Sequence, residues 1–192
     1  MFTGIIEQIA TIQKVVKENE NLHITLETDF VNELKIDQSV AHNGICLTVV
    51  AIDNNSYTVT AIQETIQKTN ISYWDITSKV NVERCMQLNG RLDGHIVQGH
   101  VDTKGVCTSV EDQDGSWKYT FEYQASHVTV DKGSITINGV SLTVVDSKID
   151  TFSVCIIPYT FEHTNFHQLK VGDYVNLEFD IIGKYVAKLM LK

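Results

Sequence analysis

An eight-residue stretch that occurs twice constrains the fold of this chain more than any other feature. Residues 43–50 read Asn-Gly-Ile-Cys-Leu-Thr-Val-Val, and residues 138–145, 95 positions later, read Asn-Gly-Val-Ser-Leu-Thr-Val-Val. The same displacement relates further identical pairs, among them Gly4 and Gly99, Thr65 and Thr160, and Glu83 and Glu178. A register kept over this length without a net insertion indicates two copies of one fold in tandem.

The repeat divides the 192 residues into two units of about 95, each large enough to bury its own core. We expect domains at residues 1–95 and 96–182, followed by a C-terminal segment at 183–192. Glycine and asparagine in residues 88–94 mark the expected boundary. The C-terminal segment has the apolar spacing of a helix, which implies docking against another surface.

Short runs of alternating or β-branched residues, separated by turn signals, predict an all-β fold. The expected strands are 22–27, 39–42, 45–52, 57–62 and 79–84 in the first half, and 95–102, 117–123, 134–137, 140–145, 152–157 and 174–180 in the second. Short helical turns are expected at 30–34 and 64–68. Six or so strands in each half predict two small antiparallel barrels, because closure of the sheet hides its edges.

Charge and composition exclude several classes of partner. The formal net charge of -9 argues against a nucleic-acid backbone or an anionic membrane. Patterned sequence begins directly at Met1, so no signal peptide is expected, and no apolar stretch is long enough to span a bilayer. The four cysteines show no CxxC spacing, which favours free thiols in the reducing cytoplasm.

Polar side chains alternate with apolar ones in both copies of the repeat. A strand with this pattern places Cys46 and Thr48 on one face, and Ser141 and Thr143 on the equivalent face of the second copy. The apolar residues between them can fill a barrel, which leaves the polar pairs to line an outer groove. From the residues alone, Cys46 is either a small buried hydrophobe or a catalytic thiol.

His100 follows a glycine at the position that Ile5 occupies in the first half. The glycine permits close approach of the backbone to a ligand, and a histidine can transfer protons near neutral pH. The alternative is a structural histidine, one of seven in the chain. A metal site formed with His95 is not expected, because residues five apart on a strand face opposite sides and no third ligand is near. Asp180 and Lys132 are weaker candidates, since both positions suit a solvated charge.

Four segments, in order and at matching spacing, carry a resemblance to a known family. They are residues 1–7 (Met-Phe-Thr-Gly-Ile-Ile-Glu), 40–49 (Val-Ala-His-Asn-Gly-Ile-Cys-Leu-Thr-Val), 94–102 (Gly-His-Ile-Val-Gln-Gly-His-Val-Asp) and 137–144 (Ile-Asn-Gly-Val-Ser-Leu-Thr-Val). These motifs resemble riboflavin synthase of the alpha, trimeric type, from Met1 to about Val186. The resemblance implies six-stranded Greek-key barrels, each binding one 6,7-dimethyl-8-ribityllumazine in a shallow groove.

Further expectations follow from this resemblance. Two lumazine molecules dismutate, and a four-carbon unit passes between them to give riboflavin and 5-amino-6-ribitylamino-2,4-pyrimidinedione, without a metal or redox cofactor. The C-terminal helices hold a homotrimer, in which the reacting pair meets between the first half of one subunit and the second half of its neighbour. Lumazine synthase is a further expected partner. Two alternatives stay open: a non-catalytic, antenna-type lumazine or flavin carrier, and a duplicated oligonucleotide-binding barrel, which the acidic charge disfavours.

The resemblance also implies the residues of the two substrate sites. The first site takes Gly4, Ile5, Ile6, Cys46, Leu47, Thr48, Thr60, Ala61, Ile62, Gln63, Glu64 and Thr65. The second takes Gly99, His100, Val101, Lys132, Ser141, Leu142, Thr143, Ile156, Ile157, Pro158, Tyr159, Thr160 and Phe161. For catalysis, the hypothesis assigns proton transfer to His100 with Thr143, and addition at C7 of the lumazine to Cys46 or a water beside it. Ser141 and Asp180 would position the rings or the nucleophile.

Overall fold

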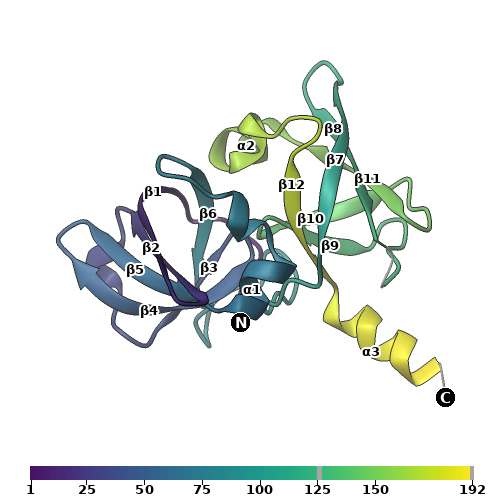
Figure 1. Ribbon diagram of the computed structural model, residues 1–192. Coiled ribbons are helices and arrows are strands. Elements are labelled where there is room, and N and C mark those ends of the chain that lie inside the picture. Colours follow the sequence, from purple (N-terminus) through teal and green to yellow (C-terminus); the bar gives the residue numbers. More distant parts are fainter. Residues whose placement is uncertain (125–126, 191–192) are drawn as a thin grey trace.

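Two closed antiparallel barrels of six strands each form the protein in the computed structural model, which describes residues 1–124 and 127–190 (Figure 1). The first barrel contains β1 (Gln8–Glu18), β2 (Asn21–Glu27), β3 (Ser39–His42), β4 (Ile45–Asp53), β5 (Ser56–Ala61) and β6 (Lys79–Arg84). The second contains β7 (Thr103–Asp112), β8 (Trp117–Tyr123), β9 (Ser134–Ile137), β10 (Val140–Val145), β11 (Thr151–Ile156) and β12 (Tyr174–Phe179). The helical elements are η1 (Val31–Glu33), α1 (Gln63–Lys68), η2 (Asn70–Tyr73), α2 (Pro158–His163), η3 (Asn165–Gln168) and α3 (Ile181–Met190).

The two barrels share one topology, as the sequence repeat predicts. The strand order β1-β2-β5-β4-β3-β6 of the first barrel recurs in the second as β7-β8-β11-β10-β9-β12. In each barrel the second strand pairs with the fifth and not with the third, so the chain crosses over in the Greek-key manner. The prediction of an all-β, duplicated barrel fold is confirmed.

The long first strand of each barrel was not among the expected strands. β1 shifts register between Ile12 and Lys14, and β7 shifts between Cys107 and Ser109. Such a bulge inserts one residue and interrupts the alternation of side chains, which is the signal that strand prediction uses. The bulges therefore conceal both strands in the sequence.

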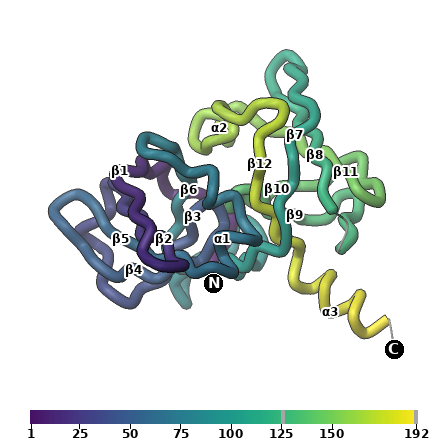
Figure 2. The backbone as a smooth tube through the Cα atoms, viewed as in Figure 1, coloured from purple at the N-terminus to yellow at the C-terminus, as the bar shows by residue number. Residues whose placement is uncertain are grey.

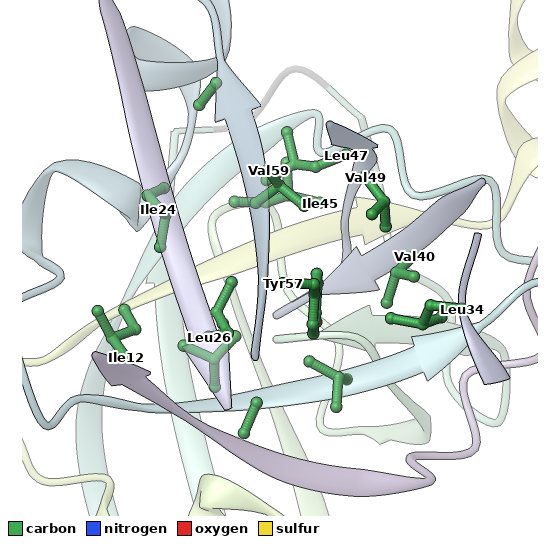
Figure 3. Packing of buried hydrophobic residues seen from close by; sticks show 14 of the residues in the cluster. Ile12, Ile24, Leu26, Leu34, Val40, Ile45, Leu47, Val49, Tyr57 and Val59 are labelled. Carbon is green, nitrogen blue, oxygen red and sulfur yellow. The ribbon is translucent and has the colours of Figure 1, made fainter. Parts of the chain in front are cut away.

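Alternation along β4 and β10 separates core from surface as expected. Ile45, Leu47 and Val49 are buried in the first barrel, where they pack against Tyr57 (Figure 3). In contrast, Thr48 on the opposite face is exposed. The polar pairs of the repeat consequently lie outside their barrels, and the apolar residues fill the interior.

Residues 95–102 do not form the strand that the sequence predicts. Apart from an isolated bridge between Phe2 and Val97, the segment is irregular, and Gly99 has a left-handed backbone with φ +80°. We call residues 98–101 the second arm. The equivalent residues 3–6 are the first arm, in which Gly4 has φ +77°. An irregular arm can leave its own barrel, whereas a strand would have to stay in the sheet.

A cluster of buried or half-buried asparagines joins the two barrels: Asn43, Asn70, Asn81, Asn138, Asn165 and Asn176. The N–H of Asn70 donates to Oδ1 of Asn176 at 2.7 Å, and the N–H of Asn165 donates to Oδ1 of Asn81 at 2.7 Å. The two turns of the repeat also touch, since a Cβ on Gly44 would lie 2.9 Å from the backbone N of Gly139. This near-twofold junction fixes the two barrels relative to one another.

The C-terminal helix α3 leaves the second barrel and extends away from both barrels (Figure 2). It begins at Ile181, two residues before the predicted start at residue 183, and Leu191 and Lys192 lie outside the described residues. Its apolar side chains are exposed: Ile182, Tyr185, Val186, Leu189 and Met190. Within residues 1–124 and 127–190, no helix has both the length and the apolarity needed to cross a membrane.

Candidate active site

Each arm contacts the polar strand of the opposite barrel. The N–H of Ser141 on β10 donates to the carbonyl of Gly4 at 2.8 Å, and the N–H of Cys46 on β4 donates to the carbonyl of Gly99 at 2.9 Å. The expected grouping, with Gly4 beside Cys46 and Gly99 beside Ser141, is therefore wrong. The 95-residue register relates equivalent positions, but it does not reveal that the arms have exchanged barrels.

The exchange creates a composite cavity beside the first barrel, with a volume of about 560 Å³. Strand β4, helix α1 and the second arm meet there, and the loops near Asp102 and His127 close one side. The lining residues are Ile45, Cys46, Glu64, Thr65, Lys68, Thr69, Gly99, His100, Val101, Asp102 and His127. Six of the residues predicted for the substrate sites are thus brought together, and they come from both expected groups.

Cys46 reaches this cavity as a thiol and not as a thiolate. Burial raises the pKa of Cys46, and a hydrogen bond with Ser39 only partly opposes this effect. A reactive cysteine normally has a lowered pKa, because the thiolate is the nucleophile. The environment of Cys46 therefore favours a neutral group that can contact a ligand or a water molecule.

Glu178 on β12 holds the second arm in place. Its carboxylate accepts the N–H groups of Gln98 at 2.6 Å, Gly99 at 2.9 Å and His100 at 2.9 Å. Burial raises the pKa of Glu178 to about 7, although the three donors and the charge of Lys184 act in the opposite direction. The anchored backbone leaves the side chain of His100 exposed at the cavity.

Beside Ser141 on the second barrel lies a histidine that was not among the predicted site residues. The Nδ1 atom of His95 lies 2.7 Å from Oγ of Ser141, and its Nε2 atom lies 3.2 Å from Oγ1 of Thr136. Burial lowers the pKa of His95, which favours the neutral imidazole. His95 was considered only as a metal ligand, and only the fold brings it within hydrogen-bond distance of Ser141, 46 residues away in the chain.

The other catalytic candidates lie apart from the composite cavity. Thr143 is exposed on β10 and does not line the cavity that contains His100. Asp180 caps α3, because its Oδ1 atom accepts the N–H of Ile182 at 2.9 Å. Lys132 occupies a turn with φ +66°, and its N–H donates to the carbonyl of Val144. Asp180 and Lys132 thus have clear structural roles.

The remaining predicted residues divide between core and surface. Leu47, Ala61 and Ile156 are buried, and Leu142 packs partly against the second core, so only their backbones can reach a ligand. Other predicted residues are at least partly accessible on the first arm, on the strands, or in and just before α1 and α2: Ile5, Ile6, Thr48, Thr60, Ile62, Gln63, Ile157, Pro158, Tyr159, Thr160 and Phe161.

The short helices give the two sites different walls. On α1, Nζ of Lys68 and Oε1 of Glu64 form an ion pair at 3.0 Å. At the equivalent positions of α2, the rings of Tyr159 and His163 stack with centroids 4.0 Å apart. The helix beside the first cavity therefore carries a charged pair, and its equivalent in the second barrel carries a stacked aromatic pair, although both derive from the same repeat.

Comparisons with known proteins show the family to which the chain belongs. The model of the lumazine binding domain matches residues 3–85 and 98–180. The riboflavin synthases of Actinobacillus pleuropneumoniae and Bacillus subtilis (strain 168) are 40% and 38% identical to the chain, and each match covers 100% of this chain and 91% of the relative. A crystal structure of LumP complexed with 6,7-dimethyl-8-(1'-D-ribityl) lumazine has the same fold, with a TM-score of 0.85 at 22% identity over 93% of this chain and 98% of that one. The chain, with its two lumazine binding domains, belongs to the riboflavin synthase family.

Proposed function

We propose that each barrel binds one 6,7-dimethyl-8-ribityllumazine and that two such molecules dismutate into riboflavin and 5-amino-6-ribitylamino-2,4-pyrimidinedione. The observation that carries this proposal is the pair of composite sites, each formed by a polar strand of one barrel and the arm of the other. Two like sites suit a reaction in which both substrates are the same molecule. The two products together contain every atom of the two substrates, so the balance needs no external oxidant or reductant.

The substrate contacts follow from the chemistry of the arms and strands. Backbone N–H and C=O groups can pair with the donor and acceptor edge of a pteridine ring, and hydroxyl groups can bind the ribityl chain. In the first site, Thr65 provides such a hydroxyl beside the second arm, and Thr48 is exposed on the same face of β4 as Cys46. In the second site, Ser141 and Thr143 do so beside the first arm.

The chemistry requires one lumazine to lose a proton from its C7 methyl group, which leaves a carbanion delocalised into the ring. His100 is the proposed proton acceptor, because its imidazole is accessible at the cavity and its backbone is anchored. The other lumazine must become electrophilic at C6 and C7. We assign addition at C7 to a water beside Cys46, since burial keeps this thiol protonated. Holding the two rings face to face supplies further acceleration through orientation.

Thr143 can assist His100 only if two chains combine their sites. We therefore propose a homotrimer, in which the His100 cavity of one subunit faces the Ser141 and Thr143 site of its neighbour. The exposed apolar residues of α3 support an assembly through this helix. Association with lumazine synthase stays a prediction.

The test is to mix the purified protein with 6,7-dimethyl-8-ribityllumazine and to follow riboflavin absorbance. We expect two lumazines to be consumed for each riboflavin formed. A carrier of the antenna type would bind the lumazine and leave it unchanged, so binding without riboflavin would overturn the proposal in favour of that alternative. Light scattering during the same experiment would measure the number of chains in the active species.

A further inference from the structure

Each arm is held by one buried carboxylate from the last strand of its own barrel. Glu83 on β6 accepts the N–H groups of Thr3 at 2.6 Å and Gly4 at 3.0 Å. Glu178 on β12 accepts three N–H groups of the second arm in the same way. Because these bonds hold the backbone that approaches the opposite barrel, each carboxylate determines where its arm lies.

A second carboxylate stands at the root of each arm. An Oε1 atom of Glu7 accepts the backbone N–H of Arg84 at 2.8 Å, and an Oδ2 atom of Asp102 accepts the backbone N–H of Phe179 at 2.9 Å. The 95-residue displacement relates Glu7 to Asp102 and Arg84 to Phe179, so the two bonds are equivalent. Each arm thus has two like charges close together, and these charges need a cation.

The two barrels obtain this cation from different places. In the first barrel the side chain of Arg84 itself pairs with Glu7 at 2.6 Å. The equivalent residue of the second barrel, Phe179, has no charge. There Lys184 from α3 pairs with Asp102, with 2.6 Å between Nζ and Oδ2, and their side chains are only 15% and 17% exposed. The C-terminal helix therefore completes a structure that the first barrel forms by itself.

We propose that Lys184 and Asp102 are positioning residues for His100, and that α3 thereby forms part of the active site. Lys184 stabilises two carboxylates, Asp102 by direct contact and Glu178 through its charge. His127 also faces Asp102, at 4.0 Å. Without Lys184, Glu178 is left beside Asp102 in a buried site without the cation, and it binds a proton more readily. A protonated Glu178 accepts the arm's N–H groups more weakly, so the backbone at His100 loosens.

This inference rests on the proposed role of His100, but its main test does not need catalysis. The full-length Lys184→Met variant removes the charge and keeps an unbranched side chain. Amide hydrogen exchange should show protection of Gly99 and His100 reduced by about tenfold or more, while the core strands keep theirs. Lys184→Arg should restore protection to within about threefold, since it keeps the cation. Lys188→Met, one turn further along the same helix where the side chain is exposed, is the matched control and should change nothing.

Turnover and assembly provide the second readout. We expect kcat for riboflavin formation in Lys184→Met to fall about tenfold, with a smaller change in KM, because the acceptor is displaced and most substrate contacts remain. Unchanged protection at Gly99 and His100 would overturn the proposal. So would a loss of activity that follows dissociation of the chains, measured by light scattering, without any change in protection. If Lys184→Met does not fold, the neutral Lys184→Gln variant must show the same loss of protection, and its failure to do so would refute the positioning role of Lys184.

Discussion

A buried pair in the first barrel, His42 and Tyr57, allows a quantitative test of how a buried histidine makes the stability of the barrel depend on pH. Nε2 of His42 lies 2.8 Å from the hydroxyl of Tyr57, and Nδ1 of His42 is buried without a hydrogen-bond partner among the described residues. The second barrel has Ile137 and Phe152 at the equivalent positions, both fully buried. Replacing the first pair by the second, as His42→Ile with Tyr57→Phe, therefore uses side chains that this fold already accommodates.

The expected change depends on pH because burial lowers the pKa of His42 from 6.5 to about 4. The unfolded chain binds a proton at His42 below pH 6.5, and the folded barrel does so only near pH 4. Above pH 6.5 His42 is neutral in both states, so its titration does not change the free energy of unfolding. As the pH drops from 6.5 towards 4, protonation of His42 in the unfolded chain lowers the free energy of unfolding. At about 1.36 kcal/mol for each pKa unit, the loss amounts to about 3 kcal/mol.

The paired variant has no proton to gain at this position, so it should not show this loss. At pH 7 its stability should equal or slightly exceed that of the wild type, because an unpaired buried polar atom costs about 1–3 kcal/mol. Tyr57→Phe alone should destabilise the barrel, since it leaves both nitrogens of His42 without a partner.

Urea unfolding between pH 7 and pH 4 measures the difference between wild type and paired variant. Hydrogen exchange of amides in β3 to β5 should accompany it, because the two barrels need not unfold in one step. A stability difference that stays constant across this range would refute the role assigned to His42. A lower stability of the variant at pH 7, with the pH-dependent difference retained, would instead show that Ile and Phe do not fit the first barrel.

Four further predictions concern the active site. His100→Gln should lower turnover by about 100-fold and slow deuterium exchange at the C7 methyl group of bound lumazine, and normal exchange would remove His100 as the proton acceptor. Cys46→Ser should keep turnover within about threefold, since the thiol is protonated, whereas a loss above about 1000-fold would restore it as a nucleophile. Gly99→Ala should reduce lumazine binding from two sites to one in calorimetry, because its Cβ would lie 2.6 Å from Cβ of Cys46 and φ is +80°. Gly4→Ala should do the same for the other site, where the contact is Ser141 at 2.6 Å, and two intact sites in either variant would contradict the composite arrangement.

The sequence repeat predicts most of the fold because the same pattern of polar, apolar and turn residues occurs twice in the chain. Polar and apolar alternation in residues 45–50 and Val140–Val145 correctly predicts which side chains face the barrel interiors. The long strands β1 and β7 were not predicted because a bulge in each interrupts the alternation of polar and apolar residues. The irregular segment 95–102 was predicted as a strand, since its apolar content is that of a strand and its positive φ cannot be read from composition.

The site residues are harder to predict than the fold. Sequence motifs point to Cys46, His100 and Ser141, but they do not show which of them share a cavity. The 95-residue displacement shows which positions of the two barrels are equivalent, but it does not show which residues touch. Because each arm contacts the opposite barrel, residues that share a site come from different barrels. His95 and Lys184 acquire their roles only through neighbours distant in sequence, Ser141 and Asp102.

The asparagine junction has a consequence for the strand-free stretch that links the barrels. Side-chain amides of Asn81 and Asn176 donate to the turn carbonyls of Asn138 and Asn43 in the opposite barrel, each at 2.9 Å. These bonds exist whether or not the peptide chain is continuous between residues 85 and 95. The contact between the barrels therefore resembles an interface between two subunits, because it is formed by side chains of one half and turn carbonyls of the other.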